Sequence, residues 1–284
     1  MIRLAAFADE ADKMVEGQIA ALKRNGVEYI ELRGLDGKNI AQISEEEAHK
    51  YAKMYADGGI KVWSLGSPIG KVDINSDLEA HRGVLRHLCR LCKIFGTDRI
   101  RMFSFYKAFD CEERVMDELR AMVAIADEYG VKLCHENEKE IFGDKLGRVL
   151  KIREQVKGLY HIYDPANFLE CGESSEDTLN ALHAGTEYFH IKDVIAETGE
   201  LVPAGYGDGN IARLVAMIGE DEDKTLTVEP HLAIFAGYSD IDNTEMKNKF
   251  KFESNNEAFD AAVNAIKNVI LSQGYKAVPG GFAK

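Results

Sequence analysis

Four polar residues that can bind a metal ion occur at four successive apolar segments in the second half of the chain. Glu136 ends the run VKLCHE, Asp164 ends LYHIYD, His190 lies within YFHIK, and Glu229 ends TLTVE. Two glutamates, one aspartate and one histidine form a hard, oxygen-rich ligand set, which suits Mn²⁺ or Mg²⁺ and accepts Co²⁺ or Zn²⁺. The sequence therefore predicts one divalent metal ion, with Mn²⁺ favoured, bound by these four side chains.

Short apolar runs alternate with longer amphipathic stretches along the chain. The runs expected to be strands are 2–7, 27–32, 61–65, 99–103, 131–136, 159–164, 188–192 and 226–229. The stretches expected to be helices include 45–57, 77–95, 113–129, 210–218 and 256–271. Strands that alternate with helices indicate a parallel sheet, and eight such units favour closure into a barrel. We therefore expect an α/β fold, a single (β/α)8 TIM barrel that forms one domain over residues 1–284.

The expected barrel explains how residues far apart in the sequence could form one site. In a closed parallel barrel the carboxyl ends of all strands lie at the same mouth, where barrel enzymes keep their active sites. A single acid at a strand end is usually a turn or capping residue. Here each acid ends an apolar run, where burial without a partner would be costly. Glu138 lies two residues after Glu136 and could replace it, but Glu136 is closer to the strand end and so more rigidly held.

The composition limits the classes of partner and compartment. The formal net charge of -13 argues against a nucleic-acid partner, because such proteins hold the polyanion with basic residues. No apolar run reaches the roughly 18 residues that a membrane span needs, and the N-terminus lacks a signal-peptide pattern. Five cysteines at irregular spacing indicate a reducing cytoplasm rather than a disulfide framework. We expect a cytoplasmic protein with a small-molecule partner, and a homo-oligomer is considered.

Several sequence segments resemble the xylose isomerase-like barrel superfamily, a group of sugar isomerases and epimerases that also includes endonuclease IV. The matching segments are SLGSPIGK, IRMFSF, CHEN, YDPAN, FHIKDV, PAGYGDGNI and VEPHL. The resemblance implies that Glu136, Asp164, His190 and Glu229 bind one divalent metal. The family's ketose 3-epimerases carry a histidine and an arginine where this chain has Asn167 and Ala196. That departure argues against a standard free-ketose 3-epimerase and leaves the metal ligands unchanged.

The expected chemistry is α-proton transfer on a hydroxy-ketone. A cation that polarises the carbonyl would favour loss of the neighbouring proton and stabilise an enediolate. Glu136 and Glu229 are the expected catalytic residues, one removing the proton and the other returning it. The resulting hypothesis is a metal-dependent isomerase or epimerase of a sugar or sugar phosphate.

Further polar and aromatic residues near strand ends are predicted to contact the substrate. They are Glu31, Trp63, Lys71, Arg101, Asn167, Lys192 and His231. For Glu31, Lys71 and Arg101 a structural ion pair is an equal alternative. For Trp63, filling of the barrel core is the favoured alternative.

Other functions remain open on the sequence alone. A lyase that cleaves oxidised (3-oxo) C-glycosides would use the same metal and carboxylates. An endonuclease IV-like nuclease would need more histidine ligands and a basic face, and a sugar-binding barrel without catalysis would bind its ligand without metal. The glycine-rich segment 203–210 is expected to be a flexible loop over the site that does not follow a strand, and the polar segment 234–253 a lid or subunit contact.

Overall fold

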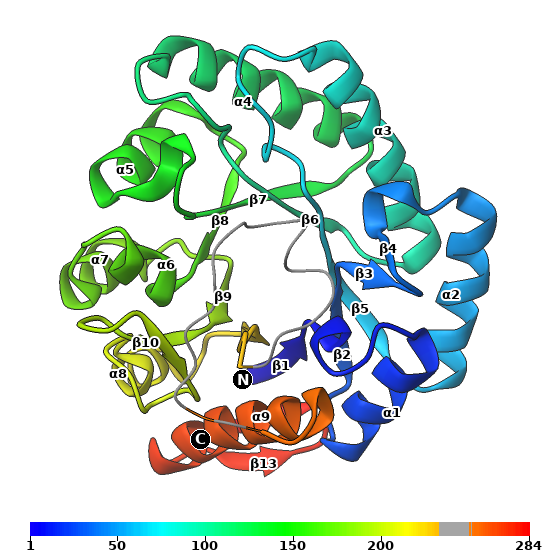
Figure 1. Ribbon diagram of the computed structural model, residues 1–284, viewed down its shortest axis with the longest axis vertical. Helices are drawn as coiled ribbons and strands as arrows, with labels where there is room; N and C mark the ends of the chain where they lie inside the picture. The colour runs from blue at the N-terminus through cyan, green and yellow to red at the C-terminus, as the bar shows by residue number, and fades with distance from the viewer. Residues whose placement is uncertain (233–249, 251) are drawn as a thin grey trace.

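A closed barrel of parallel strands forms the centre of the computed structural model, which describes residues 1–232, 250 and 252–284 (Figure 1). Around the barrel the strands are β1 (Ile2–Ala6), β2 (Tyr29–Leu32), β5 (Lys61–Gly66), β6 (Arg99–Met102), β7 (Lys132–Glu136), β8 (Tyr160–Tyr163), β9 (Tyr188–Ile191) and β12 (Lys224–Val228). Parallel pairing of β12 with β1 closes the ring. The predicted (β/α)8 barrel is confirmed.

Helices surround the barrel and cover its outer face (Figure 1). They are α1 (Val15–Arg24), α2 (Glu45–Asp57), α3 (Leu78–Phe95), α4 (Glu112–Glu128), α5 (Leu146–Gln155), α6 (Pro165–Glu170), α7 (Ser175–Leu182), α8 (Ile211–Ala216) and α9 (Asn255–Ser272). Short 3-10 turns lie at Ala8–Glu10, Ile40–Gln42 and Phe142–Asp144. The expected helices therefore agree with the observed ones to within a few residues. Ser44 and Glu47 form the capping box that starts α2, satisfying two backbone N–H groups at the helix end.

The main core lies between the strands and the surrounding helices. Strand residues are buried almost without interruption, as expected for parallel strands with both faces covered. Cys89 and Cys92 are buried on α3, so the C-x-x-C pair belongs to the core face of that helix. A smaller cluster of Cys134, Ile162 and Tyr188, with Trp63 packed against it, is separate from the main core.

Three hairpins were not foreseen from the sequence. β3 (Gly34–Leu35) pairs with β4 (Lys38–Asn39) directly after β2. At the chain end, β13 (Lys276–Val278) pairs with β14 (Gly281–Ala283), and β14 joins the outer edge of β1.

The third hairpin corrects one expectation. The glycine-rich segment 203–210 was expected not to follow a strand, but β11 (Glu200–Val202) precedes it and pairs antiparallel with β10 (Asp193–Ile195). The run is only three residues long and acquires strand structure by pairing back across a tight turn, which apolar periodicity does not reveal.

Two further expectations concern the segment 234–253 and membrane spans. The predicted lid or subunit contact at 234–253 falls mainly on residues 233–249 and 251, outside the described residues. Among the helices that the structure describes, none combines the length and apolar character needed to cross a bilayer.

Candidate metal centre and active site

The four predicted metal ligands come together at the carboxyl ends of four neighbouring strands. Glu136 is the last residue of β7, Asp164 follows β8, His190 lies within β9, and Glu229 follows β12. One potential ligand atom from each lies within 4.8 Å of the other three, and all four side chains are buried. Because the barrel register brings these strand ends to one level, four distant residues form one cluster.

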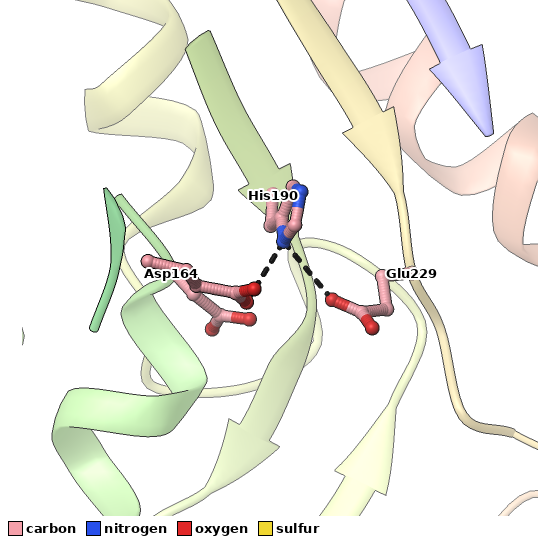
Figure 2. A group of neighbouring side chains, drawn as sticks. Asp164, His190 and Glu229 are labelled. Carbon is pink, nitrogen blue, oxygen red and sulfur yellow. Dashed lines mark hydrogen bonds and ion pairs between the residues drawn. The ribbon is translucent and has the colours of Figure 1, made fainter. Parts of the chain in front are cut away.

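The imidazole of His190 lies at the centre of this cluster and points between Asp164 and Glu229 (Figure 2). Its Nδ1 atom is 2.8 Å from Glu136 Oε1 and 3.1 Å from Glu229 Oε2. Its Nε2 atom faces the opposite way and is 3.1 Å from Glu31 Oε2. Burial opposes a charged imidazole, but the Glu136 and Glu31 carboxylates outweigh burial and raise the pKa of His190 well above its usual value. Nδ1 is therefore the nitrogen directed at the other potential ligands.

Asp164 has one oxygen in a structural role and one directed into the cluster. Its Oδ1 accepts the backbone N–H of Asn167 at 3.0 Å and so caps the short helix α6, which begins with Pro165. Its Oδ2 is buried, accepts no hydrogen bond from the described residues, and forms an ion pair with Lys192 Nζ at 3.2 Å. Burial outweighs the effect of Lys192 and, together with the Glu136 and Glu229 charges, raises the pKa of Asp164 to about 7.

Glu229 divides its two oxygens in a similar way. Oε1 accepts a hydrogen bond from Arg33 Nη1 at 3.1 Å. Oε2 faces His190 Nδ1 at 3.1 Å and has no further partner in the part of the chain that the structure describes. Burial opposes the Glu229 carboxylate, but the contacts with His190 and His231 lower its pKa well below the usual value. Glu229 thus stays ionised, with one oxygen held and the other available.

The chemistry and spacing of the four residues fit a divalent cation. Ligands at about 2.0–2.6 Å from one ion lie no more than about 5 Å apart, which the cluster satisfies. Two buried carboxylate oxygens, Asp164 Oδ2 and Glu229 Oε2, make no regular hydrogen bond to any described residue. Each faces one basic group, Lys192 Nζ at 3.2 Å from Asp164 Oδ2 and His190 Nδ1 at 3.1 Å from Glu229 Oε2. A divalent cation between them would complete the coordination of both oxygens. A cation would also relieve the mutual repulsion of the three carboxylates.

A second group of possible ligands, Glu10, Glu229 and His231, lies beside the first. Here a cation is already present, because Arg33 contacts Glu10 Oε1 at 3.2 Å and Glu229 Oε1 at 3.1 Å. Burial raises the pKa of Glu10 to about 8 and lowers that of His231 to about 4. We therefore interpret this second group as an Arg33-centred ion-pair network rather than a second metal site.

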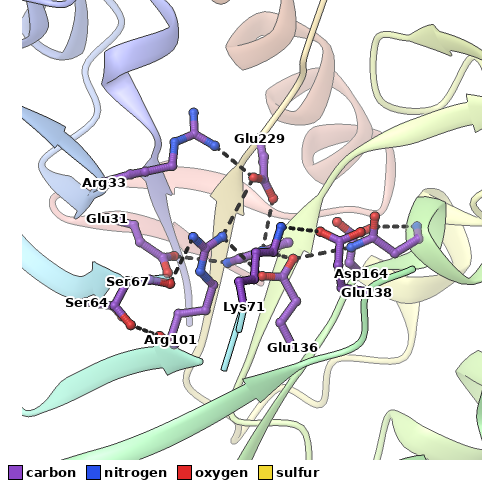
Figure 3. Close-up of polar contacts among 12 residues, drawn as sticks. Glu31, Arg33, Ser64, Ser67, Lys71, Arg101, Glu136, Glu138, Asp164 and Glu229 are labelled. Carbon is purple, nitrogen blue, oxygen red and sulfur yellow. Dashed lines mark hydrogen bonds and ion pairs between the residues drawn. The ribbon is translucent and has the colours of Figure 1, made fainter. Parts of the chain in front are cut away.

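A cavity of about 730 Å³ opens next to the cluster of four candidate ligands, on the side of β1, β2, β5 and β6. This volume is within the usual range for sites that bind small molecules. Arg33, Lys71 and Arg101 line the cavity and also contact carboxylates of the cluster region (Figure 3). A molecule in the cavity would therefore lie against three basic side chains at the edge of the metal cluster.

Comparison with known proteins assigns the family. The sequence model described as xylose isomerase-like TIM barrel matches residues 19–248. The chain belongs to the xylose isomerase-like TIM barrel family. No curated protein matches the chain.

Solved structures share this fold at low sequence identity. They include the probable 3-DHS dehydratase AsbF from Bacillus anthracis, 16% identical, with a TM-score of 0.72 over 94% of this chain and 99% of that chain. An L-ribulose 3-epimerase is 18% identical, with a TM-score of 0.72 over 96% of each chain. The IOLI protein, solved with a zinc atom, is 18% identical, with a TM-score of 0.71 over 95% of this chain and 99% of that chain. These likenesses establish the common fold.

In this xylose isomerase-like barrel, five of the seven predicted substrate-contacting residues fall into three groups. Lys71 and Arg101 line the cavity. Lys192 and Asn167 lie buried beside the cluster, with Lys192 Nζ donating to Asn167 Oδ1 at 2.6 Å. His231 is buried in the Arg33-centred network, 3.4 Å from Glu229 Oε1. Each of these assignments to substrate remains a prediction.

The remaining two predicted contact residues, Glu31 and Trp63, lie below the four candidate ligands. Glu31 is fully buried, with one oxygen beside His190 and the other accepting a hydrogen bond from Tyr188 at 2.9 Å. Trp63 packs edge-on against Tyr188 and carries the Arg99 guanidinium 4.2 Å above its ring. Arg99 begins β6, so Trp63 occupies the amino-terminal part of the barrel interior. Neither residue is among those that line the cavity.

Three residues of the site were missed from the sequence. Arg33 follows β2 directly and binds Asp9 with two hydrogen bonds, of 2.8 and 3.1 Å, in addition to Glu10 and Glu229. Its position after an apolar run is the same signal that identified the four ligands. Asp9 and Glu10 lie in the turn after β1, where acidic residues are common, so their sequence gave no comparable signal.

The glycine-rich loop 203–210 is organised around one carboxylate. Asp193 accepts backbone N–H groups of Gly205, Gly207 and Gly209 at 2.8 to 3.0 Å. A side chain at Gly207 would collide with Asp193, since a Cβ there would lie 2.5 Å from its carboxylate oxygen. The glycines therefore allow the loop to wrap around an acid of this chain, which argues against their use as a phosphate cradle.

Proposed function

We propose that this protein is a divalent-metal-dependent isomerase or epimerase that transfers an α-proton on a sugar or sugar phosphate. One observation carries the proposal: Glu136 and Glu229 both contact His190 Nδ1, at 2.8 and 3.1 Å, and come from different strands. Two carboxylates that share one metal position can act on a substrate from different sides. The low-identity likeness to an L-ribulose 3-epimerase is compatible with this reaction class.

The chain supplies the groups for proton transfer and for orientation. A bound divalent cation would polarise the substrate carbonyl and make the neighbouring C–H bond more acidic. One of Glu136 and Glu229 accepts that proton and the other returns a proton, which inverts a centre or moves the carbonyl. Lys192, buried beside Asp164, is placed to donate a hydrogen bond to a substrate oxygen. Lys71 orients the part of the substrate that extends into the cavity.

The hard donor set favours Mn²⁺, with Mg²⁺, Co²⁺ and Zn²⁺ as alternatives. A cytoplasmic setting agrees with the cysteines, because all five are without a disulfide bond. We propose that residues 1–284 act as one catalytic domain on a small molecule, without a nucleic-acid partner.

Solvent-deuterium exchange tests the proposed function even when the identity of the product is unknown. Metal-loaded protein is incubated in D₂O with ketoses, ketose phosphates and 3-oxo-glycosides, and each substrate is analysed for deuterium by mass spectrometry and NMR. We expect deuterium at a carbon next to a carbonyl in one substrate class, dependent on added metal. Asp164→Asn serves as the metal-site control and should lose the exchange.

The products separate the proposed reaction from its rivals. Exchange together with a new epimer or isomer supports the proposal. Exchange together with release of a β-substituent from a 3-oxo-glycoside assigns the lyase reaction instead. If no substrate shows exchange and ligand binding is unchanged by metal removal, the protein is a sugar-binding barrel without catalytic activity.

A further inference from the structure

Arg101 connects the two carboxylates to which proton transfer is assigned. Its Nη1 donates to Glu136 Oε2 at 3.2 Å and lies 4.0 Å from Glu229 Oε1 (Figure 3). In both glutamates these are the oxygens that do not contact His190 Nδ1. One guanidinium group thus reaches the outward oxygen of each carboxylate, while the inner oxygens converge on the metal position.

The Arg101 side chain is held in this place by its surroundings. Its guanidinium lies 5.2 Å from the centre of the Phe7 ring and 4.7 Å from that of Phe103, within the range of cation–π attraction. Ser67 is fully buried and donates its hydroxyl to the Arg101 carbonyl at 2.6 Å. Gly66 is the register partner of Arg101, and a Cβ at Gly66 would come within 2.6 Å of the Phe7 ring. The glycine therefore leaves space for the ring on which the guanidinium rests.

The neighbouring Arg33 has a different set of hydrogen-bond partners. Its three guanidinium nitrogens all donate hydrogen bonds to carboxylates, of Asp9, Glu10 and Glu229. Arg101 is 6% exposed, and its Nε has no hydrogen-bond partner among the described residues. Its second terminal nitrogen makes one long contact, 3.5 Å, to the Ser67 carbonyl. All three guanidinium nitrogens of Arg33 are thus hydrogen-bonded. Arg101 lies between the two acids and still has N–H groups that can donate hydrogen bonds beside the cavity.

We propose that Arg101 is a positioning residue that holds the outward oxygen of Glu136 and, together with Arg33, that of Glu229. Each carboxylate then presents a single oxygen to the metal and keeps the other in place for proton transfer. This inference rests on the proposed function for its kinetic consequence, but its geometric part concerns the protein alone. Without Arg101, the outward oxygen of Glu136 would be able to rotate towards the cation, and this carboxylate would change from one-oxygen to two-oxygen ligation. Glu229 Oε1 would stay hydrogen-bonded to Arg33.

Co²⁺ is a suitable probe because its visible absorption reports the number and arrangement of its ligands. We would load the parent protein, Arg101→Met and Arg101→Lys with Co²⁺ and measure cobalt content, thermal stability and the visible spectrum. Arg99→Met is the matched control, because Arg99 lies on the same strand, carries an aromatic cation–π contact and pairs with Glu187, but at the other end of the barrel.

We expect one cobalt ion per chain in all four proteins. In Arg101→Met the visible bands should lose intensity, as happens when the ion gains ligand atoms, while Arg99→Met should give the parental spectrum. Arg101→Lys should resemble Arg101→Met, because a flexible ammonium cannot reproduce a planar guanidinium that packs against Phe7 and Phe103. Parental spectra in both Arg101 variants would overturn the inference, whether or not a substrate has been found.

The kinetic test uses the substrate identified by deuterium exchange. Loss of carboxylate position should lower kcat by about 10²-fold with KM nearly unchanged, because misplacement by about 1 Å can cost that much. A raised KM with a parental kcat would overturn the inference and make Arg101 a substrate-binding group. If no substrate shows exchange, the proposed function fails while the cobalt spectra still decide the role of Arg101.

Discussion

His190 Nε2 and Glu31 Oε2 lie 3.1 Å apart with both side chains completely buried. Tyr188 and Ser64 extend this contact, since the Tyr188 hydroxyl is 2.9 Å from the other Glu31 oxygen and 3.2 Å from Ser64 Oγ. The chain of contacts fixes the imidazole from the side opposite to the proposed metal. A histidine ligand is commonly oriented by a carboxylate on its second nitrogen, which also raises its basicity as a ligand.

Replacing Glu31 with Gln should weaken metal binding without removing a proposed ligand. Loss of such an orienting carboxylate typically costs about 10–100-fold in metal affinity. Competition with a coloured chelator would measure the affinity for Mn²⁺. Glu28→Gln is the control, because Glu28 is an exposed residue that pairs with Lys61 at 3.7 Å. Equal affinities in the parent and Glu31→Gln would show that Glu31 does not orient His190.

Glu229→Gln should abolish α-proton exchange even when the metal is retained. The amide oxygen can still coordinate, but it cannot accept a proton, and general base catalysis contributes about 10²–10⁴-fold. Exchange rate and metal content must be measured on the same sample, because ligand loss alone would also lower the rate. A variant that keeps its metal and exchanges at the parental rate would make Glu229 a simple ligand, and the base would then have to be sought at Glu136, Glu138 or His231.

The protein should bind one metal ion per chain rather than two. Arg33 already supplies the cation in the group of Glu10, Glu229 and His231. We therefore expect elemental analysis to give one equivalent of Mn²⁺ both in the parent and in Glu10→Gln, and much less in Asp164→Asn. Two equivalents in the parent that fall to one in Glu10→Gln would refute the interpretation of Arg33 as the resident cation.

The stability of the protein should fall on mild acidification, in part through His161. Burial, with the nearby Arg153 charge, lowers the pKa of His161 well below its usual value of 6.5. The folded protein therefore keeps this imidazole neutral, while the unfolded chain binds a proton below about pH 6.5. The stability that results is present above that pH and is lost as the pH falls, by about 1.4 kcal/mol per pH unit for one proton.

His161→Phe should reduce this acid sensitivity. Urea unfolding at about pH 7 and about pH 5.5 would give the free energy of unfolding for the parent and the variant. We expect a smaller loss between the two pH values in His161→Phe, and a parental loss in the control His49→Asn, since His49 lies on α2 away from the barrel interior. An identical loss in His161→Phe and the parent would mean that His161 is not held neutral by the fold.

The barrel and the four clustered residues could be predicted because both depend on local patterns. Apolar runs alternate with amphipathic stretches at the right spacing, and Glu136, Asp164 and Glu229 each terminate such a run. In a parallel barrel this position alone determines the end of the molecule at which a side chain lies. His190 lies within its apolar run rather than at the end, so its prediction also relied on the neighbouring residues of that run. The convergence of the four side chains followed from topology.

Other parts of the site depend on distances that the sequence does not contain. Because side chains alternate between the two faces of a strand, Trp63 could be placed inside the barrel. The alternation does not say at which level along the barrel axis a side chain lies, and Trp63 lies near the amino ends of the strands. Glu31 stands at a strand end yet turns its oxygens towards His190 and Tyr188. Asp193 organises the glycine-rich loop through backbone N–H groups, which no side-chain pattern reveals.

The most direct test of the central claim is an anomalous diffraction measurement on crystals of the Mn²⁺-loaded protein. The anomalous difference map should contain one strong peak within about 2.0–2.6 Å of one oxygen or nitrogen atom from each of Glu136, Asp164, His190 and Glu229. A peak that lies away from these side chains, or that only one or two of them reach, would contradict the claim that four strand ends of this barrel form one metal centre.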